Sequence, residues 1–302
     1  MRTIRALFLA ALAGCWPESE HVQIISNDCL GAAVCDNEPL ALYGHQSGYS
    51  GLAKLRHEWN RDRDIFVPFL AGLNYETNWL RGAPNSPWEI QAEPRFEPMT
   101  LRRIDERTVE LHQEETSVKH IEALLRFRIH NNIAAVDFDF TFTPRQAPPV
   151  ENPNFGPDVI VMFANYMCDP ADPRLYAFGH TPGDPRPRWL RYEGIKHGDY
   201  WVEERDGSGE HVSPGDVTLD RPYMAGKVGG MLVAWMVETP GAFGIYYSPN
   251  GDMSLDYKTP AWDFTLSFRD VAVGQPLTAR GRLIVVPMGT LRDVEPAYQA
   301  WR

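Results

Sequence analysis

The chain has 302 residues, of which 43% are hydrophobic, 23% charged and 12% aromatic, with 24 Gly and 25 Pro. This composition excludes a disordered chain, which has fewer aromatic residues, and a collagen-like or low-complexity chain, which shows a repeat or far more Gly and Pro. The net charge of −11 at pH 7 argues against nucleic acid as a partner, because phosphate backbones are bound by an excess of Lys and Arg.

The first 14 residues have the layout of an export signal. Two arginines precede an apolar run over residues 6–14, and Cys15 follows that run, as in a bacterial lipoprotein signal. The run is too short to span a bilayer, so a lipidated Cys15 is the one expected route to membrane attachment. The sequence predicts a signal segment over residues 1–14 and one β-sandwich domain over residues 15–302. The protein is expected in the periplasm or at the cell surface, or in the cytoplasm if the segment is not cleaved.

The cysteines leave two alternatives open. Cys29 and Cys35 enclose five residues, a spacing that suits a small disulfide of an exported protein or two reduced thiols on one short hairpin. Cys168 has no obvious partner, and the sequence contains no Cys-x-x-Cys pair. Because the histidines are also scattered without ligand spacing, the sequence predicts no metal site and no cofactor.

Alternation of apolar and polar residues with a period of two dominates the middle of the chain. Residues 121–129 and 136–143 each place apolar side chains on one face and polar ones on the other, and His130-Asn131-Asn132 between them is a turn signal. A hairpin with His130 opposite Ala135 would pair opposite charges across the strands, namely Arg128 with Asp137 and Arg126 with Asp139.

Further strands are predicted in chain order at 158–167, 229–237, 242–247, 262–269 and 277–286, separated by Gly, Pro, Asn and Asp clusters. One helix is expected, over residues 294–301, after the capping pair Thr290 and Asp293. These elements predict an all-β fold, a large antiparallel β-sandwich with a short C-terminal helix, in which two stacked sheets bury their apolar faces.

Two early segments carry candidate site residues. Glycines flank His45 and Tyr49 in the segment 44–51, which brings backbone close to a neighbour and leaves both side chains free to act, although a solvent-exposed turn has the same composition. Asn74 and Glu76 follow, with Trp79 and Trp88 nearby. Aromatic faces cover the apolar side of a sugar ring, and Glu76 could serve as an acid or base; a polar strand end beside core tryptophans is the alternative.

The third candidate begins at Asn165 and Tyr166 and continues into residues 180–201, which the sequence predicts to be a long irregular segment. Such segments in compact β domains often carry function, and the arginines at 186, 188 and 191 would suit a carboxylate or sulfate on a ligand. A charged, solvated loop is the alternative. The candidate residues in this segment are His180, Arg188, Trp189, Tyr192, His197, Tyr200 and Trp201.

The fourth candidate is Asp263, midway along a predicted strand. Alternation places Trp262 and Phe264 in the core and Asp263 on the polar face, where a carboxylate can line a cleft. The alternative, and the favoured one, is a cross-strand ion pair between Asp263 and Arg280 or Arg282.

The organisation of these segments resembles the galactose-mutarotase-like β-supersandwich proteins, a carbohydrate-associated superfamily. The resemblance covers most of residues 21–287 and lies in the early glycine-rich region, the strand pair ending at Thr143-Pro144 and the late strands around 260–264. The segments 44–49 and 260–264 are also similar to those of a group of uncharacterised bacterial β proteins. Aldose epimerases of the superfamily carry an Asn-His-Thr-Tyr-Phe-like segment with a catalytic His, which this sequence lacks, so no residue role is transferred.

Together, the candidate residues and the resemblance predict a carbohydrate-active enzyme that performs acid/base chemistry on a saccharide, by cleaving a glycosidic bond or opening a sugar ring. A hydrolase would use Glu76 and Asp263 as its two carboxyl groups. A lyase acting on a uronate-containing glycan is one alternative, with His45, Tyr49, His180 and His197 as acid and base and Asn165 with the arginines at the uronate carboxylate. A non-catalytic glycan-binding surface lipoprotein is the other.

Overall fold

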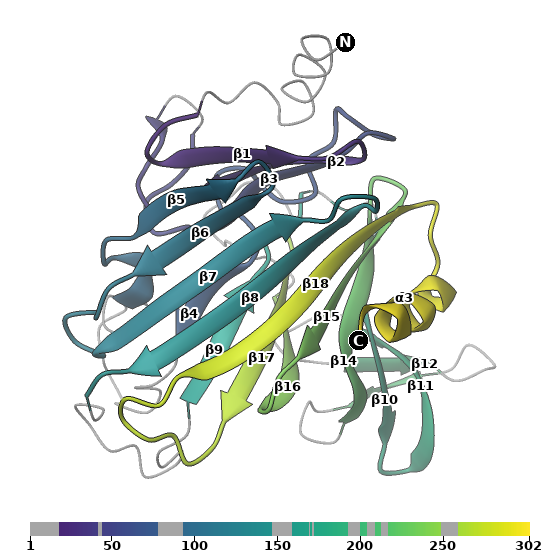
Figure 1. Ribbon diagram of the computed structural model, residues 1–302. Helices are drawn as coiled ribbons and strands as arrows, with labels where there is room; N and C mark the ends of the chain where they lie inside the picture. Colours follow the sequence, from purple (N-terminus) through teal and green to yellow (C-terminus); the bar gives the residue numbers. More distant parts are fainter. Residues whose placement is uncertain are drawn as a thin grey trace.

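A computed structural model describes residues 18–41, 44–77, 93–146, 159–168, 170, 172–192, 200–203, 209–212, 217–248 and 259–302. Its strands form three antiparallel sheets, and one helix, α3 (Val294–Trp301), lies at the end of the chain (Figure 1). The all-β prediction is therefore confirmed, with α3 at the bounds expected from the sequence.

The largest sheet has eleven strands and forms one layer of the sandwich. In spatial order they are β13 (Gly209–Val212), β12 (Tyr200–Glu203), β11 (Asp184–Tyr192), β10 (Asp172–Thr181), β14 (Thr218–Val228), β15 (Met231–Glu238), β18 (Leu277–Pro287), β8 (Ala135–Pro144), β7 (Ile121–Ile129), β6 (Thr108–Gln113) and β5 (Thr100–Asp105).

Two smaller sheets complete the sandwich. The four-stranded sheet has the order β16 (Ala242–Ser248), β17 (Ala261–Phe268), β9 (Val159–Ala164) and β4 (Asn74–Thr77). The three-stranded sheet consists of β1 (Val22–Ser26), β2 (Leu30–Cys35) and β3 (Gly51–His57). Figure 1 shows β4, β9, β17 and β16 behind the strands of the largest sheet, so the four-stranded sheet forms the second layer.

The hairpin of β7 and β8 has the register that the charge pattern predicts. Arg128 lies opposite Asp137 and Arg126 opposite Asp139, and the N–H of His130 donates to the carbonyl of Ala135 at 2.9 Å. Arg128 forms the expected ion pair with Asp137 at 3.1 Å. The guanidinium of Arg126, however, pairs with Glu110 of β6 at 2.7 Å, because β6 supplies a buried carboxylate on the other side of β7.

Aromatic rings fill the space between the two layers. Phe138 of β8 contacts Phe163 of β9 and Phe264 of β17, with ring centroids 6.0 and 6.1 Å apart. Room for Phe138 depends on Gly281 of β18, since a Cβ at that position would lie 1.9 Å from the ring. Trp262, which the alternation placed in the core, is buried against Trp235 of β15. The sandwich core thus follows the predicted apolar faces.

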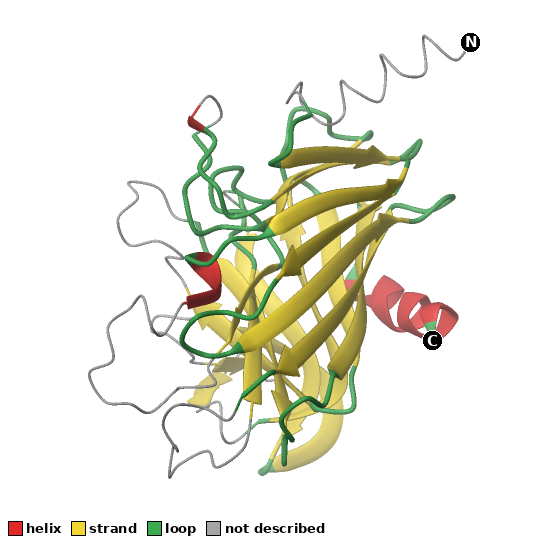
Figure 2. Ribbon diagram, turned by 60° about the vertical axis from the view of Figure 1, so that its left-hand side comes forward, coloured by secondary structure: helices red, strands yellow, loops and turns green. Residues whose placement is uncertain are grey.

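The helix α3 covers part of the opposite face of the largest sheet. Figure 2 shows it on one side of the stacked sheets, with most of the loops on the other. Its Val294 and Tyr298 are buried against a cluster that includes Tyr223 of β14 and Met236 of β15. The Thr290 N–H donates to the Asp293 carboxylate at 2.7 Å, so the predicted capping pair is present in the short 3₁₀ turn before α3.

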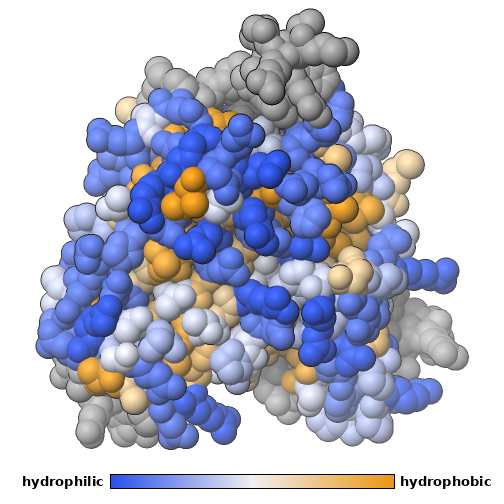
Figure 3. All heavy atoms as spheres, in the orientation of Figure 1, coloured by the Kyte–Doolittle hydropathy of each residue, from blue (hydrophilic) through white to orange (hydrophobic). Residues whose placement is uncertain are grey.

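Elsewhere that face carries an ordered array of charged side chains. Glu110 pairs with Arg102 and Arg126, and Asp137 pairs with Arg128 and Arg282. Figure 3, in the orientation of Figure 1, shows the resulting surface as largely hydrophilic with scattered apolar residues.

One local prediction was wrong. The segment expected to be irregular from residue 180 contains the end of β10 and the whole of β11, which form a hairpin joined at Pro182 and Gly183. Cys29 directly precedes β2 and Cys35 ends it, and both are free thiols, because an extended strand holds residues six apart roughly 20 Å from each other. The disulfide alternative is therefore excluded. The alternative of two reduced thiols on one hairpin agrees with the structure, since Cys29 lies in the turn between the paired strands β1 and β2.

Candidate functional site

Three polar side chains share the outer face of the four-stranded sheet. Along β4, Tyr75 points into the sandwich and contacts Phe140, so Asn74 and Glu76 point the other way. Along β17, Phe264 points into the sandwich, which turns Asp263 to the same outer face. Asn74 lies directly opposite Ala164 of β9, and β9 separates β4 from β17. Strand alternation thus brings an amide and two carboxyl groups onto one surface.

Arg95 joins this face from the short 3₁₀ helix η2 (Glu93–Arg95). Its guanidinium forms a buried salt bridge with Glu76 and donates to the phenol oxygen of Tyr166 at 2.9 Å. The ring of Tyr49 lies 4.5 Å below the guanidinium, and it packs edge-on against Tyr166. We call Asn74, Glu76, Arg95, Tyr166 and Asp263 the polar cluster.

Burial sets the protonation of two members of the polar cluster. It raises the pKa of Asp263 well above its usual value; the N–H of Asn165 and the charge of Arg95 oppose this rise, and Glu76 adds to it. Burial likewise raises the pKa of Tyr166, although Arg95 acts against it. Burial lowers the pKa of Arg95, but Glu76 more than compensates, so that pKa lies above its usual value. Asp263 therefore keeps its proton to higher pH than an exposed carboxyl group does, and Tyr166 is protonated at neutral pH beside a charged Arg95.

Several hydrogen-bonding groups of the polar cluster have no protein partner among the described residues. The Asn74 Oδ1 accepts from the Ser50 N–H at 2.9 Å, but its Nδ2 is buried without an acceptor. Glu76 uses only Oε1 and Asp263 only Oδ1, which accepts from the Asn165 N–H at 2.9 Å. Buried polar groups are almost always satisfied, so the unused donors and acceptors indicate a site for water or a polar ligand.

The glycine-flanked segment reaches the polar cluster through Tyr49 and is fixed by His45. The His45 Nδ1 lies 2.9 Å from the Pro68 carbonyl, and Nε2 lies 2.8 Å from the Tyr49 carbonyl. Because both partners are acceptors, both contacts are hydrogen bonds only when both ring nitrogens carry protons. His45 is 2% exposed, so its ring holds the segment in place and presents neither nitrogen to a ligand.

Asn165 fixes the backbone around the polar cluster. Its Oδ1 accepts from the Leu73 N–H and its Nδ2 donates to the Phe163 carbonyl, both at 3.0 Å. Leu73 and Ala71, just before Asn74, adopt left-handed backbone angles with φ of 52° and 63°. Such conformations are unfavourable for residues other than Gly and persist where surrounding contacts impose them. The side chain of Asn165 is therefore fully engaged within the protein.

The structure thus gathers half of the candidates, from four separate parts of the sequence. His45, Tyr49, Asn74, Glu76, Asn165, Tyr166 and Asp263 all lie in or against the polar cluster. The favoured ion pair of Asp263 is wrong. Arg280 pairs with Glu238 and Arg282 with Asp137, because both arginines belong to the other sheet, on the far side of the core from Asp263.

The candidates of the β10–β11 hairpin lie elsewhere. His180 pairs with Asp220 of β14 at 2.7 Å, and Trp189 packs against Phe178 and Tyr223 beneath α3. Tyr192 is buried and donates to the Ile245 carbonyl at 3.2 Å.

The arginines of that hairpin are not arranged for a ligand. Arg186 and Arg188 both pair with Asp184, at 2.7 and 3.1 Å. The hydrogen bond from Arg186 lowers the pKa of Asp184 below its usual value. A carboxylate of the protein already occupies the position expected for a ligand carboxylate.

Other candidates are placed only in part. Tyr200 and Trp201 belong to β12, where the backbone of Trp201 pairs with Arg191 of β11. The described residues do not include Cys15, Trp79, Trp88 or His197.

Sequence reasoning missed Arg95. No motif surrounds it, and it reaches Glu76 only because η2 packs against β4. Its neighbour Glu93 accepts from the Lys119 N–H at 2.8 Å and so ties η2 to the turn before β7. Lys119 is itself buried, which lowers its pKa to about 8, and its Nζ donates to the Thr77 carbonyl at 2.7 Å. The only available signal was an arginine among apolar and acidic residues.

Among the described residues, no group of three or more His, Cys, Asp or Glu side chains is arranged to hold a metal ion. No helix in the described part of the chain is long and apolar enough to cross a membrane.

Comparisons with known proteins show distant likenesses. No protein-family model matches the sequence, and no curated protein matches it. The chain is similar to a TPR-domain containing protein from Parabacteroides distasonis (12% identity, TM-score 0.47), covering 88% of this chain and 47% of that one. It is also similar to a GH36 alpha-galactosidase from Geobacillus stearothermophilus in complex with stachyose (9% identity, TM-score 0.45), covering 89% of this chain and 41% of that one. A third similar structure is that of a galactose mutarotase related enzyme from Lactobacillus acidophilus (7% identity, TM-score 0.41), covering 88% of this chain and 98% of that one.

Proposed function

We propose that this protein is a carbohydrate-active enzyme that performs acid/base chemistry at a sugar carbon in the polar cluster. One observation carries the proposal: two carboxyl groups share a sheet face in opposite electrostatic settings. Burial raises the pKa of Asp263 and so favours its protonated form, whereas Glu76 forms a salt bridge with Arg95. Carboxyl groups whose surroundings separate their proton affinities in this way divide naturally into an acid and a base.

The chemistry follows from the free atoms of the polar cluster. Asp263 donates its proton to the leaving oxygen of a glycosidic bond, and the carboxylate of Glu76 acts from the other side of the sugar ring. Arg95 orients Glu76 through its salt bridge. The Asn74 Nδ2 and the phenol proton of Tyr166 have no acceptor in the described protein and bind sugar hydroxyls or the ring oxygen. The Tyr49 ring, half-buried beside Arg95, covers an apolar sugar face.

The lyase alternative is less well supported by this arrangement. Both nitrogens of His45 face backbone carbonyls, and His180 pairs with Asp220 away from the polar cluster. Arg95, the cation nearest Tyr166, is already paired with Glu76 and is not free for a uronate carboxylate. The binding-module alternative requires an exposed aromatic strip, but Trp189 is partly buried against Phe178 and Tyr223, and Tyr192 is buried.

The test is incubation with a panel of oligosaccharides and polysaccharides while following reducing ends and the absorbance of unsaturated uronates. We expect new reducing ends without unsaturated products. Glu76→Gln and Asp263→Asn should each lower the rate by at least about 100-fold, the usual contribution of a general acid or base. Matched controls are Glu122→Gln and Asp139→Asn, two carboxylates of the other sheet.

The anomer of the first product, read by NMR, identifies the role of Glu76: retention indicates a nucleophile and inversion indicates a base that activates water. Full activity in both cluster variants would overturn the assignment of these residues. Sugar binding without any turnover would instead establish a binding protein.

A further inference from the structure

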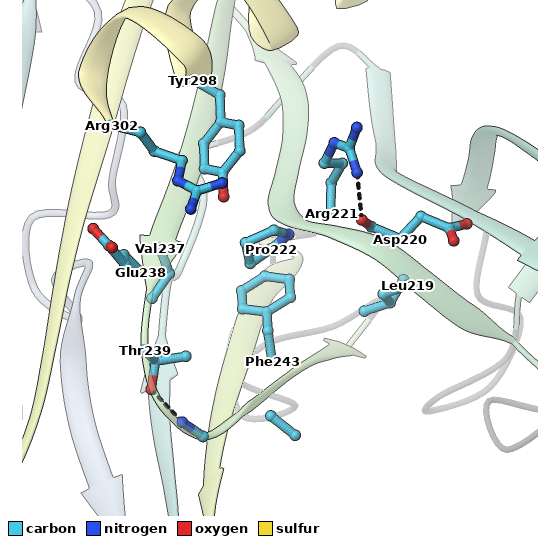
Figure 4. Close-up of a pocket in the computed structure, with 12 residues that line it drawn as sticks. Leu219, Asp220, Arg221, Pro222, Val237, Glu238, Thr239, Phe243, Tyr298 and Arg302 are labelled. Carbon is cyan, nitrogen blue, oxygen red and sulfur yellow. Dashed lines mark hydrogen bonds between the residues drawn. The ribbon is translucent and has the colours of Figure 1, made fainter.

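A second cavity, with a volume of about 400 Å³, lies on the α3 side of the molecule and shares no residue with the polar cluster. It is formed by the start of β14, the turn between β15 and β16, and the end of α3 (Figure 4). Its volume falls within the roughly 300–1,000 Å³ of cavities that bind small molecules. We call it the arginine cavity, after Arg221 and Arg302 in its lining.

Apolar rings provide one wall of the arginine cavity. Figure 4 shows the rings of Pro222 and Phe243 next to one another, with the ring of Tyr298 above them. Pro222 and Phe243 are partly exposed, whereas Tyr298 is 4% exposed and is fixed by an edge-on contact with Tyr223. Flat apolar surfaces of this kind stack against the faces of a ligand ring.

The acidic side chains of the lining have partners outside the cavity. Asp220 pairs with His180 at 2.7 Å, and Glu238 forms a salt bridge with Arg280. Neither His180 nor Arg280 lines the cavity. The carboxylates of Asp220 and Glu238 therefore bind side chains outside the cavity, and neither forms an ion pair with Arg221 or Arg302 in the described part of the chain.

The two arginines of the lining differ in their contacts. Arg302 lies over the Tyr298 ring at 5.6 Å and forms no ion pair with any residue that the structure describes. Arg221 donates through Nη1 to the Asp220 carbonyl at 3.0 Å and forms a salt bridge through Nε with Glu295 at 3.4 Å. In a chain of net charge −11, the arginine cavity is a local site for an anion.

We propose that the arginine cavity binds a sugar that carries a carboxylate, of the uronate type. The sugar ring stacks on Pro222 and Phe243, and its carboxylate lies between Arg221 and Arg302 as a charge-assisted acceptor. Thr239 is available for a sugar hydroxyl: its Oγ1 accepts from the Gly241 N–H at 3.1 Å, and its hydroxyl proton has no acceptor among the described residues. The carboxylate, rather than the ring, selects this ligand over a neutral sugar.

The experiment measures binding of glucuronate, glucose and acetate to the full chain by calorimetry, with NMR detection of the Thr239 and Tyr298 amides. The Asp263→Asn variant is used throughout, so that turnover in the polar cluster cannot contribute and the result stands independently of the proposed function. We expect glucuronate to bind at least about tenfold more tightly than glucose or acetate, since ring stacking and the arginine contacts add.

Variants then assign the contacts. Arg221→Gln and Arg302→Gln should each weaken glucuronate binding about tenfold and leave glucose binding unchanged. Phe243→Leu, which keeps the fold but removes the flat ring, should weaken both sugars. Arg292→Gln is the matched control, because Arg292 is an exposed arginine outside the cavity. Three results would each overturn the proposal. They are equal binding of glucuronate and glucose, no binding of glucuronate, and glucuronate binding that is unchanged in both arginine variants although these keep a native melting profile.

Discussion

Burial of the Asp263 carboxyl group affects stability and the proposed chemistry in opposite directions. Its pKa in the folded protein is raised above the ordinary value of 3.8, so the folded state keeps the proton to higher pH than the unfolded state does. Stability from this residue is therefore fully present below 3.8 and declines as the pH rises toward the folded pKa. The same neutral form is the one that can act as an acid.

We predict that Asp263→Asn raises the melting temperature at pH 7 and changes it little near pH 4. Asn is neutral at every pH, and its Oδ1 can still accept from the Asn165 N–H. The variant therefore keeps the stability that the wild type loses as the pH rises above 3.8. Thermal melting across this pH range checks the prediction, with Asp139→Asn as an exposed control. A uniform destabilisation at every pH would show that burial does not govern this residue.

The salt bridge between Arg95 and Glu76 supports a second prediction. Both side chains are below 10% exposed, so removal of Arg95 leaves a buried carboxylate without its cation. Arg95→Met should lower the free energy of unfolding by about 3–5 kcal/mol, and Arg95→Met with Glu76→Met should recover part of that loss. Urea denaturation of the two variants tests it. A double variant less stable than Arg95→Met would contradict the assignment.

At the scale of the secondary-structure elements, the packing of the neighbouring strands β8 and β18 depends on one glycine, Gly281. Gly281 faces the ring of Phe138, which in turn contacts Phe163 and Phe264 of the opposite sheet. Contact between the two layers at this point therefore depends on the absence of a side chain on β18. An alternating pattern marks Phe138 as a core residue, but it does not indicate which neighbour must be small.

We predict that Gly281→Ala destabilises the protein by about 1–3 kcal/mol, the usual cost of overpacking. In a Phe138→Leu background the same substitution should cost less, since its partner is no longer a rigid ring. Gly183→Ala is the control, because a Cβ there has no atom within 4 Å. Chemical denaturation of the four proteins gives the coupling, and an equal cost in both backgrounds would count against the close contact.

At the scale of the whole molecule, one core joins the three sheets. Ile25 of β1, Leu52 of β3, Phe138 of β8 and Phe163 of β9 belong to the same buried cluster. We therefore predict a single thermal transition, with equal calorimetric and van't Hoff enthalpies. Two resolved transitions would mean that the three-stranded sheet unfolds independently of the sandwich.

Local pattern explains which parts of the fold were predictable. The hairpin of β7 and β8, the strand β17 and the helix α3 follow from apolar periodicity, charge pairing and capping within a few residues of each other. The hairpin of β10 and β11 was missed because Pro182, Pro185 and Pro187 resemble loop punctuation. Two of these prolines lie in the first half of β11, where Pro is more readily tolerated than in the middle of a central strand.

The sequence by itself determined the strands β7–β9 and β15–β18, their buried faces and most of the residues of the polar cluster, because side-chain alternation is a property of neighbours along the chain. Tertiary structure alone decided that Asn74, Glu76, Tyr166 and Asp263 share one surface, since strand order and register join segments far apart in sequence. It also decided that Arg95 reaches Glu76 and that burial keeps the proton of Asp263. Proximity and desolvation exist only after the sheets have packed, and no local pattern encodes them.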